Sequence, residues 1–295
     1  MNRLDDPKME HYKSIFKNSE MWLGKTELKD KKVIVYFEQG VGDCIQFIRY
    51  LKKLKDHGCY IIASCHKSMH SLLEYIDGVD ECIDKLSTEI PEHDYHILAM
   101  DLPFLLLYDK CVFPLDIEQW WLGESLEGYM EIINEEIPKP PYINFLETTD
   151  LEKEGINVGI AWEGNPGHEN NKLRSCPLRH FSVLETNLFC LQDKIYSAEL
   201  SSDCEEMELY GVEINDFKDT ARLINSVDLV ISVDTAVLHL AGALGKKGYG
   251  IFSNDYSDGR WNLEEPKSLW YPTLELIKDK WENLFKTLVE KIESI

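Results

Sequence analysis

The stretch from Asp228 to Gly245 constrains the fold of this chain more than any other. Its first part, Leu229 to Val233, is short, apolar and rich in β-branched residues, which is typical of a buried parallel strand. Asp234 and Thr235, both good helix N-caps, follow directly, and small and apolar residues then predict a helix that ends at Gly245. A strand that feeds straight into a helix leaves free N–H groups at the carboxyl edge of the sheet, where they favour a phosphate or pyrophosphate. The sequence therefore predicts a ligand-binding crevice in an α/β domain.

Length and charge narrow the class of protein. A chain of 295 residues can form two domains of ordinary size. No apolar run approaches the roughly 20 residues of a membrane span, and the first six residues lack the apolar core of a signal peptide. We therefore expect a cytoplasmic protein with no membrane span. The net charge of −22 argues against nucleic acid as a partner, because affinity for polyanions comes mainly from cations.

Strand and helix patterns alternate along the chain, and the alternation starts again after Pro138-Lys139-Pro140-Pro141, where neither regular element can continue. This pattern predicts an α/β fold with two Rossmann-like, doubly wound parallel sheets. Strands are expected at residues 32–37, 60–63, 95–100, 156–162, 189–192, 229–233 and 248–252. The expected divisions are a helical extension (1–30), a first Rossmann-like domain (31–140), a second one (141–278) and a terminal amphipathic helix (279–295).

The segment Gly40-Val41-Gly42-Asp43 stands where the first strand turns into a helix. Glycines there permit positive φ and a close approach of a ligand to the backbone. Asp43 has two interpretations that the residues alone leave open. It caps its helix, or it is a general base that faces an interdomain cleft and takes a proton from a hydroxyl nucleophile.

The loop that follows the strand at 156–162 carries turn formers and then two cations, Lys172 and Arg174, which stand out in so acidic a chain. These cations could neutralise a diphosphate leaving group. The alternative is an ordinary solvated loop. Their expected position, at the same sheet edge as Asp234 and Thr235, favours the functional interpretation.

His239 lies four residues after Thr235, on the same helix face. A histidine in an apolar helix is usually a core residue, but near a phosphate-binding terminus it could also donate to a ligand or loop. Asp234 cannot attract phosphate by charge, so we expect it to fix the loop or accept a ligand hydroxyl, while the N–H groups of Thr235 and Ala236 face the anion. Gly242 is expected to let the helix pack closely on the sheet.

These residues together carry a resemblance. Residues 38–43, followed by Gln46, Phe47, Arg49 and Tyr50, resemble the first motif of glycosyltransferase family nine, the heptosyltransferase relatives, which are often fused to tetratricopeptide repeats. Further segments resemble that family in the same order along the chain: residues 100–103, 162–166, 174–175, 232–243 and 270–272. The match spans roughly residues 20–285, so it is more specific than any single motif.

The resemblance implies a GT-B fold, in which residues 31–140 form the acceptor domain, residues 141–278 form the nucleotide-sugar domain, and the terminal helix crosses back to the first domain. It implies metal-independent inverting transfer of a sugar from a nucleotide-diphosphate sugar to a hydroxyl of a glycan or other acceptor, with no cofactor. Asp43 then matches the catalytic base. The donor and phosphate site matches Lys172, Arg174, Asp234, Thr235, Ala236 and His239, and further cleft positions are Gln39, Gly40, Gly42, Gln46, Trp162, Gly164, Asn165, Arg260 and Trp261.

The chain departs from the family pattern at Lys247, where a proline is usual, and at Gly259, where an aromatic residue is common. Both departures concern the part of the domain expected to hold the nucleotide base. They motivate an alternative function, a protein that binds a nucleotide-sugar or glycan without turning it over. Sugar transfer to modified DNA bases is disfavoured by the acidic charge. A dehydrogenase is disfavoured because neither half has a Gly-x-Gly-x-x-Gly turn after its first strand.

Overall fold

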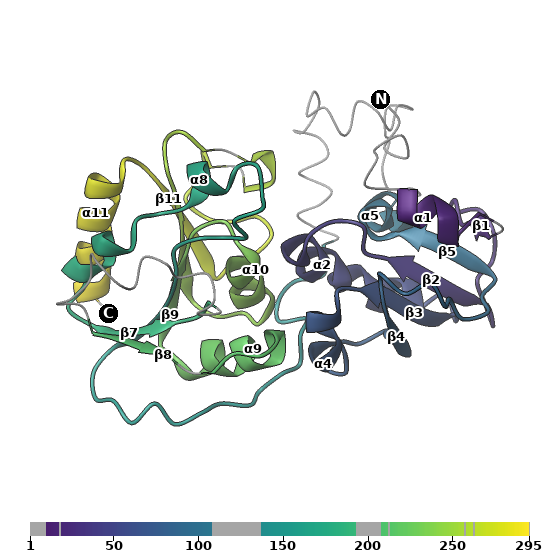
Figure 1. The fold of residues 1–295 in the computed structure, drawn as a ribbon, viewed down its shortest axis with the longest axis horizontal. Helices are drawn as coiled ribbons and strands as arrows, with labels where there is room; N and C mark the ends of the chain where they lie inside the picture. Colours follow the sequence, from purple (N-terminus) through teal and green to yellow (C-terminus); the bar gives the residue numbers. More distant parts are fainter. Residues whose placement is uncertain are drawn as a thin grey trace. The chain divides into compact units, whose positions relative to one another are not determined.

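The computed structural model describes residues 10–17, 19–107, 137–192, 208–211, 213–256, 258–261 and 263–294. The chain divides into two compact units, Met1–Pro138 and Lys139–Ile295, and each unit holds one parallel β-sheet with helices packed on it (Figure 1). Two doubly wound α/β sheets are what the alternating pattern predicts, and that prediction is confirmed.

The first unit has a five-stranded sheet in the order β1-β5-β2-β3-β4, with every pair parallel. Its strands are β1 (Glu20–Met21), β2 (Lys32–Tyr36), β3 (Tyr60–Cys65), β4 (Glu81–Asp84) and β5 (Tyr95–Leu98). Its helices and 3₁₀ turns are α1 (Glu10–Ile15), α2 (Val41–Phe47), η3 (Ile48–Tyr50), α3 (Leu51–Lys55), η4 (Lys67–Met69), α4 (His70–Leu73), η5 (Ala99–Asp101) and α5 (Leu102–Leu107).

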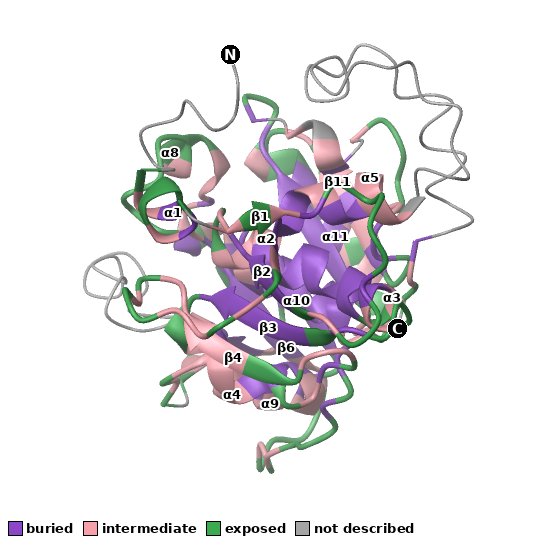
Figure 2. Ribbon diagram, turned by 90° about the vertical axis from the view of Figure 1, so that its right-hand side faces the viewer, coloured by how far each residue is buried: buried purple, intermediate pink, exposed green. Residues whose placement is uncertain are grey.

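Burial in this sheet follows strand position. The inner strands β2 and β3 are buried along almost their whole length, whereas the edge strand β4 is half-buried (Figure 2). A parallel strand covered on both faces needs a nearly continuous apolar run, and the β2 and β3 sequences supply one. Helix α1 and the residue after it, Phe16, add an aromatic cluster to one face, in which Phe16 stacks on the buried His96 with ring centroids 4.6 Å apart.

The second unit has a six-stranded sheet in the order β11-β10-β9-β6-β7-β8, again parallel throughout. Its strands are β6 (Asn157–Ala161), β7 (Asn187–Cys190), β8 (Leu209–Gly211), β9 (Leu229–Ser232), β10 (Gly248–Phe252) and β11 (Leu274–Lys278). Its helices and 3₁₀ turns are α8 (Asn171–Arg174), η7 (Leu178–Val183), α9 (Phe217–Ser226), α10 (Ala236–Ala243), η10 (Gly259–Trp261) and α11 (Trp281–Glu293).

Alternate residues of strand β10 face different helices. Tyr249 and Ile251 belong to a core cluster with the apolar residues of η7 and α11. A Cβ on Gly250 would instead lie 3.1 Å from the Leu238 side chain of α10. Helix α10 therefore packs on the sheet face opposite α11, as the period of two along a strand requires.

The expected terminal helix is present as α11, and its apolar stripe is buried in the core of the second unit. The buried residues of this helix share one cluster with strands β6, β7, β9 and β10, and they are Leu284, Phe285, Leu288 and Ile292. Within the described ranges, no helix combines the length and the apolar character that crossing a bilayer requires.

Some elements differ from the sequence-based expectation. The single helix expected after the first strand is divided into α2, η3 and α3, and the backbone turns at Gly58, whose φ is +78°. The strands β1, β4, β8 and β11 are absent from the prediction. Each contains exposed or half-buried positions, so none has the continuous apolar run that marks the predicted strands.

Candidate donor site

Three neighbouring strands bring the candidate residues of the second unit to one edge of the sheet. Strands β10, β9 and β6 are adjacent and parallel, so their carboxyl ends lie side by side. Trp162 follows β6, Asp234 follows β9 and Tyr256 follows β10. The predicted ligand edge is therefore built from loops that are separated in sequence but adjacent in space, as in other open α/β sheets.

The start of helix α10 offers backbone donors at this edge. Thr235 is the N-cap, in an extended conformation (φ −142°, ψ 171°), and its side chain does not cap the helix. Its hydroxyl instead lies 3.1 Å from the hydroxyl of Ser232. In the part of the chain that the structure describes, no protein group accepts a hydrogen bond from the N–H of Ala236 or of Val237. These amides and the helix dipole together favour an anion at this position.

Arg174 reaches the same edge from helix α8. Its Nη1 donates to the backbone carbonyl of Asp234 at 3.1 Å, and its Nε donates to Asn171 Oδ1 at 3.4 Å. Asn171 Oδ1 also accepts from the N–H of Gly164 at 3.1 Å, so one amide ties the loop together. The structure thus places Arg174 next to the α10 start, where the sequence predicts a phosphate-binding cation.

The other predicted loop residues lie farther out. Lys172 is exposed, on the solvent side of the short helix α8. Asn165 is exposed too, and its Oδ1 accepts from the N–H of Gly167 at 2.8 Å within the loop. Of the two cations, Arg174 is the one in contact with the strand-end loops.

Asp234 is almost completely buried, with 5% of its surface exposed. Its Oδ2 accepts a hydrogen bond of 2.6 Å from the hydroxyl of Tyr256, and its Oδ1 lies 3.9 Å from Nε2 of His239. Burial and the adjacent carboxylate raise the pKa of Tyr256, so this phenol stays protonated and remains a donor. The contacts agree with the expectation that Asp234 fixes the loop.

His239 is a buried residue with specific partners. Its Nδ1 lies 2.8 Å from the hydroxyl of Tyr271, and its ring packs 4.9 Å from the ring of Trp261. The expectation that Gly242 allows close packing on the sheet is wrong. A Cβ on Gly242 would lie 2.3 Å from the ring of Tyr271, so the glycine makes room for this tyrosine.

Two tryptophans expected at a cleft are core residues. Trp162 and Trp261 are each 1% exposed. The Trp162 side chain belongs to the main core cluster of the unit, and Trp261 packs among Phe252, His239 and Tyr271. The expectation that these side chains line an open cleft is therefore wrong, because large aromatic groups in the segments that follow strands also close the core.

Arg260 forms an ion pair with the neighbouring carboxylate of Asp258. Its Nε and Nη2 donate to Asp258, at 3.0 Å to Oδ1 and 2.8 Å to Oδ2 respectively. Burial raises the pKa of Asp258, but the hydrogen bonds and the charge of Arg260 outweigh burial and hold that pKa below its ordinary value. Arg260 also anchors Trp270, whose indole N–H donates to the Arg260 carbonyl at 2.7 Å.

In the first unit, Asp43 acts as a helix cap. Its Oδ2 accepts from the N–H of Gly40 at 3.1 Å, which is the capping interpretation. Asp43 also lines a small recess with Glu38 and Met100 at the carboxyl end of β2, so the capping bond does not remove it from the surface of this edge. The positive φ that glycine permits is not used here, since Gly40 adopts φ −71° and Gly42 is likewise not in the left-handed region.

The two glutamines of the first motif differ in environment. Gln39 is exposed, and its backbone carbonyl accepts from Lys85 Nζ at 2.9 Å. Gln46 is completely buried on α2, and among the described residues its side-chain amide has no hydrogen-bond partner. The expectation that Gln46 lies at a cleft is therefore wrong, whereas Gln39 does lie at the surface.

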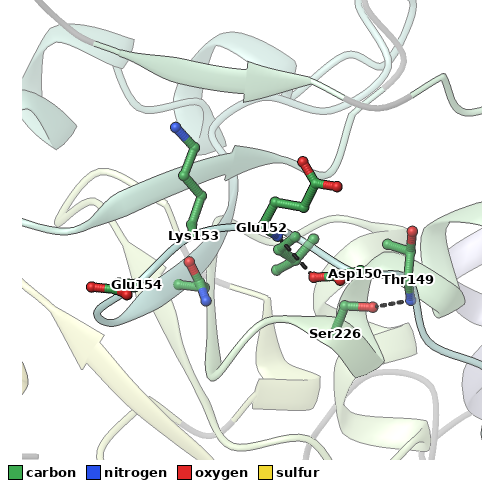
Figure 3. A pocket seen from close by; sticks show the side chains of 8 residues that line it. Thr149, Asp150, Glu152, Lys153, Glu154 and Ser226 are labelled. Carbon is green, nitrogen blue, oxygen red and sulfur yellow. Dashed lines mark hydrogen bonds between the residues drawn. The ribbon is translucent and has the colours of Figure 1, made fainter.

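A broad hollow of about 560 Å³ lies elsewhere on the second unit. It is lined by polar residues of the segment before β6 and by Ser226, whose Oγ accepts from the N–H of Thr149 at 2.7 Å (Figure 3). The hollow reaches Asn157, the first residue of β6, so it lies at the amino ends of the strands. Parallel α/β sheets bind ligands at the other edge, and this hollow is not part of the candidate site.

Sequence reasoning missed three residues of the site, Tyr256, Asp258 and Tyr271. Tyr271 stands in the segment 270–272 that carries part of the family resemblance, which is a usable signal. For Tyr256 the only signal in the sequence is its position after a predicted strand, at the edge of the sheet where a ligand is expected. Asp258 is recognisable only with its partner Arg260, two residues later.

Comparison with known proteins gives one family and a set of similar folds. The family model "Glycosyltransferase family 9 (heptosyltransferase)" matches residues 188–265, which include strand β9 and the start of helix α10. No curated protein sequence matches this chain.

Solved structures resemble the chain over most of its length. The glycosyl transferase family 9 protein from Veillonella parvula DSM 2008 has a TM-score of 0.60 at 13% identity, covering 92% of this chain and 99% of its own. The E. coli ADP-heptose lps heptosyltransferase II has a TM-score of 0.53 at 14% identity, covering 89% and 99%. E. coli heptosyltransferase WaaC with ADP has a TM-score of 0.55 at 11% identity, also covering 89% and 99%.

At such identities the structures establish the fold alone, a GT-B-like fold with two parallel α/β sheets. The family model covers the segment that carries the candidate donor loop. The chain is thus similar to family 9 glycosyltransferases in one segment of its sequence, residues 188–265, and to solved structures of that family in its fold.

Proposed function

We propose that the protein transfers a sugar from a nucleotide-diphosphate sugar to a hydroxyl acceptor with inversion and without a metal ion. The observation that carries this proposal is the start of helix α10, where the N–H groups of Ala236 and Val237 have no acceptor among the described residues and Arg174 lies beside them. A helix start next to a guanidinium is suited to a diphosphate.

The donor is proposed to be an ADP-linked sugar. The similar structure of WaaC contains ADP, and another WaaC structure contains ADP-2-deoxy-2-fluoro heptose. In this chain the diphosphate would accept hydrogen bonds from the α10 amides and from Arg174. These donors would stabilise the negative charge that develops on the leaving diphosphate, a role that a bound metal has in other enzymes.

The acceptor side of the reaction is assigned to Asp43. The carboxylate would take the proton of the acceptor hydroxyl as that oxygen attacks the anomeric carbon from the face opposite the diphosphate. The new glycosidic bond forms as the bond to the diphosphate breaks, and ADP leaves. Donor binding and proton removal would thus come from different units of the chain.

Calorimetric titration with ADP tests the donor site directly. Ala236 is the first residue of α10, a position where proline fits the helix and removes only an N–H that has no partner in the helix. The extended conformation of Thr235 also suits a residue before proline. Ala236→Pro should weaken ADP binding on the order of tenfold or more, since a hydrogen bond to a charged group is worth about 1.5–3 kcal/mol.

The matched control is Ala236→Gly, which changes the same residue but keeps the N–H, and it should bind ADP nearly as the wild type does. EDTA should leave ADP binding unchanged in every variant. The donor-site proposal is wrong if the wild type binds no nucleoside diphosphate, or if Ala236→Pro binds ADP as tightly as Ala236→Gly. Binding of ADP-linked sugars with no ADP release across a panel of hydroxyl acceptors would favour the non-catalytic binding protein.

A further inference from the structure

Asp234 joins three loops that come from three neighbouring strands. Its backbone carbonyl accepts from Arg174, which follows β6, and its side chain accepts from Tyr256, which follows β10. Asp234 itself follows β9 and directly precedes Thr235, the N-cap of α10. Any displacement of this residue would therefore change both the cation and the helix start of the candidate donor site.

The position of the Asp234 carboxylate poses an electrostatic problem. A buried carboxylate next to a helix start that receives a diphosphate repels that ligand, because burial reduces the screening of its charge. A hydrogen bond from a neutral donor disperses part of the charge and fixes the direction in which the carboxylate points. The hydroxyl of Tyr256, 2.6 Å from Oδ2, is such a donor.

The second carboxylate oxygen faces His239, at 3.9 Å from Nε2. The hydroxyl of Tyr271 lies against the other ring nitrogen, Nδ1, at 2.8 Å. If Nε2 had no proton, its lone pair would point toward the carboxylate, which is unfavourable. The arrangement therefore favours the tautomer in which Tyr271 donates to Nδ1 and the imidazole proton is on Nε2, toward Asp234.

We propose that Tyr256 is a positioning residue of the donor site, acting through Asp234. Its hydroxyl holds the Asp234 carboxylate in the interior and reduces the repulsion between that carboxylate and a diphosphate at the start of α10. The inference rests on the proposed function, since it requires a diphosphate at that helix start. Tyr256 does not itself need to contact the ligand.

The experiment compares ligands that differ only in phosphate number. Adenosine, AMP and ADP are titrated into the wild type and into Tyr256→Phe, which keeps the ring and removes the hydroxyl. Because the proposed effect is repulsion by a charge, the loss of affinity should grow with the charge of the ligand. We expect ADP affinity to fall on the order of tenfold, AMP affinity to fall less and adenosine affinity to stay unchanged.

Two further variants separate positioning from packing. In an Asp234→Asn background the charge is absent, so adding Tyr256→Phe should change ADP affinity less than twofold. Tyr249→Phe removes the hydroxyl of another buried tyrosine, on β10 itself, and should leave all three affinities unchanged. The melting temperature of each variant reports folding independently of binding.

The outcomes distinguish this inference from the proposed function. Absence of ADP binding by the wild type overturns the proposed function and this inference with it. Normal ADP binding by the wild type together with an equal loss for adenosine, AMP and ADP in Tyr256→Phe overturns the inference alone, because equal losses indicate packing. An unchanged ADP affinity in Tyr256→Phe overturns it as well.

Discussion

The guanidinium of Arg174 occupies the space that a side chain on Gly164 would need. A Cβ built on Gly164 would lie 2.3 Å from Nη2 and 2.6 Å from Cζ of Arg174. The absence of a side chain at Gly164 therefore lets the Arg174 guanidinium pack among the loops at the strand ends. Its hydrogen bond to Asn171 and the bond from Arg174 to the Asp234 carbonyl hold this arrangement in place.

Gly164→Ala should displace Arg174 from the donor site. The expected result is a fall in ADP affinity of about tenfold, because a charge-assisted contact to the diphosphate is lost, with little change in melting temperature. Calorimetric titration measures the affinity. Gly167→Ala is the control in the same loop, since that glycine is exposed and its Cβ would meet only Asn165 Oδ1 at 3.3 Å. An unchanged affinity in Gly164→Ala would show that Arg174 does not contact the ligand.

Asp43→Asn should abolish sugar transfer and leave donor binding intact. Asparagine keeps an oxygen that can accept from the N–H of Gly40, so the cap of α2 is preserved while the base is lost. We expect kcat for ADP release from an ADP-linked sugar to fall by at least about 100-fold, the usual range for a general base. The ADP dissociation constant should not change. Wild-type turnover in this variant would show that Asp43 caps helix α2 but is not the general base.

The predictable part of the molecule is the part encoded locally. The strand-to-helix unit at 228–245 is present as β9 and α10, and the left-handed Gly245, with φ +74°, follows the helix as expected. Its signals are an apolar run, an N-cap and a terminal glycine, all within one short segment. The same alternation predicts that the loops after β6, β9 and β10 lie at one edge of the sheet, but it does not predict the order of the strands.

The partners of the site residues could not be predicted. Tyr271 is 32 residues from His239, and Tyr256 is 22 residues from Asp234, so no local periodicity connects them. The role of Gly242 depends on a tertiary contact too, the one with Tyr271. A small residue in a helix indicates that another group packs closely against it, but it does not indicate which group. For Trp261 the sequence shows an aromatic residue in the segment after a predicted strand, where an open cleft and a closed core are equally compatible with the pattern.

Gly242→Ala tests the contact with Tyr271. The added methyl group would meet the ring at 2.3 Å, so the tyrosine must move, and we expect a loss of about 1–3 kcal/mol in the free energy of unfolding. Denaturant titration measures this loss. When Tyr271 is first replaced by Leu, the same alanine substitution should cost much less. Equal costs in both backgrounds would contradict the clash as the reason for this glycine.

The first unit should lose stability at mildly acidic pH because of His96. Burial, with a smaller effect of His93, lowers the pKa of His96 to about 4 from an ordinary value of 6.5. Below pH 6.5 the unfolded chain binds a proton that the folded chain does not, so stability falls as pH decreases and the loss is complete below about pH 4. The full effect is on the order of 3 kcal/mol.

Denaturant unfolding at pH 7.5, 5.5 and 4.5 measures this dependence. His96→Gln removes the titrating group and should show a smaller decrease in stability between pH 7.5 and 4.5 than the wild type. His57→Gln replaces an exposed histidine of the same unit. The stability of this variant should decrease with pH as that of the wild type does. Parallel pH curves for the wild type and His96→Gln would contradict the assignment.

The sheet order of the second unit has a consequence for synthesis on the ribosome. Strand β6 comes first in this unit but lies in the interior of the sheet, between β7 and β9. The N–H of Asn157 at its start donates to the side chain of Asp228, 71 residues later. The edge of β6 that pairs with β9 therefore stays unpaired while that long segment is translated. An unpaired strand edge can pair with other chains, so we expect the nascent chain to be prone to aggregation during this interval.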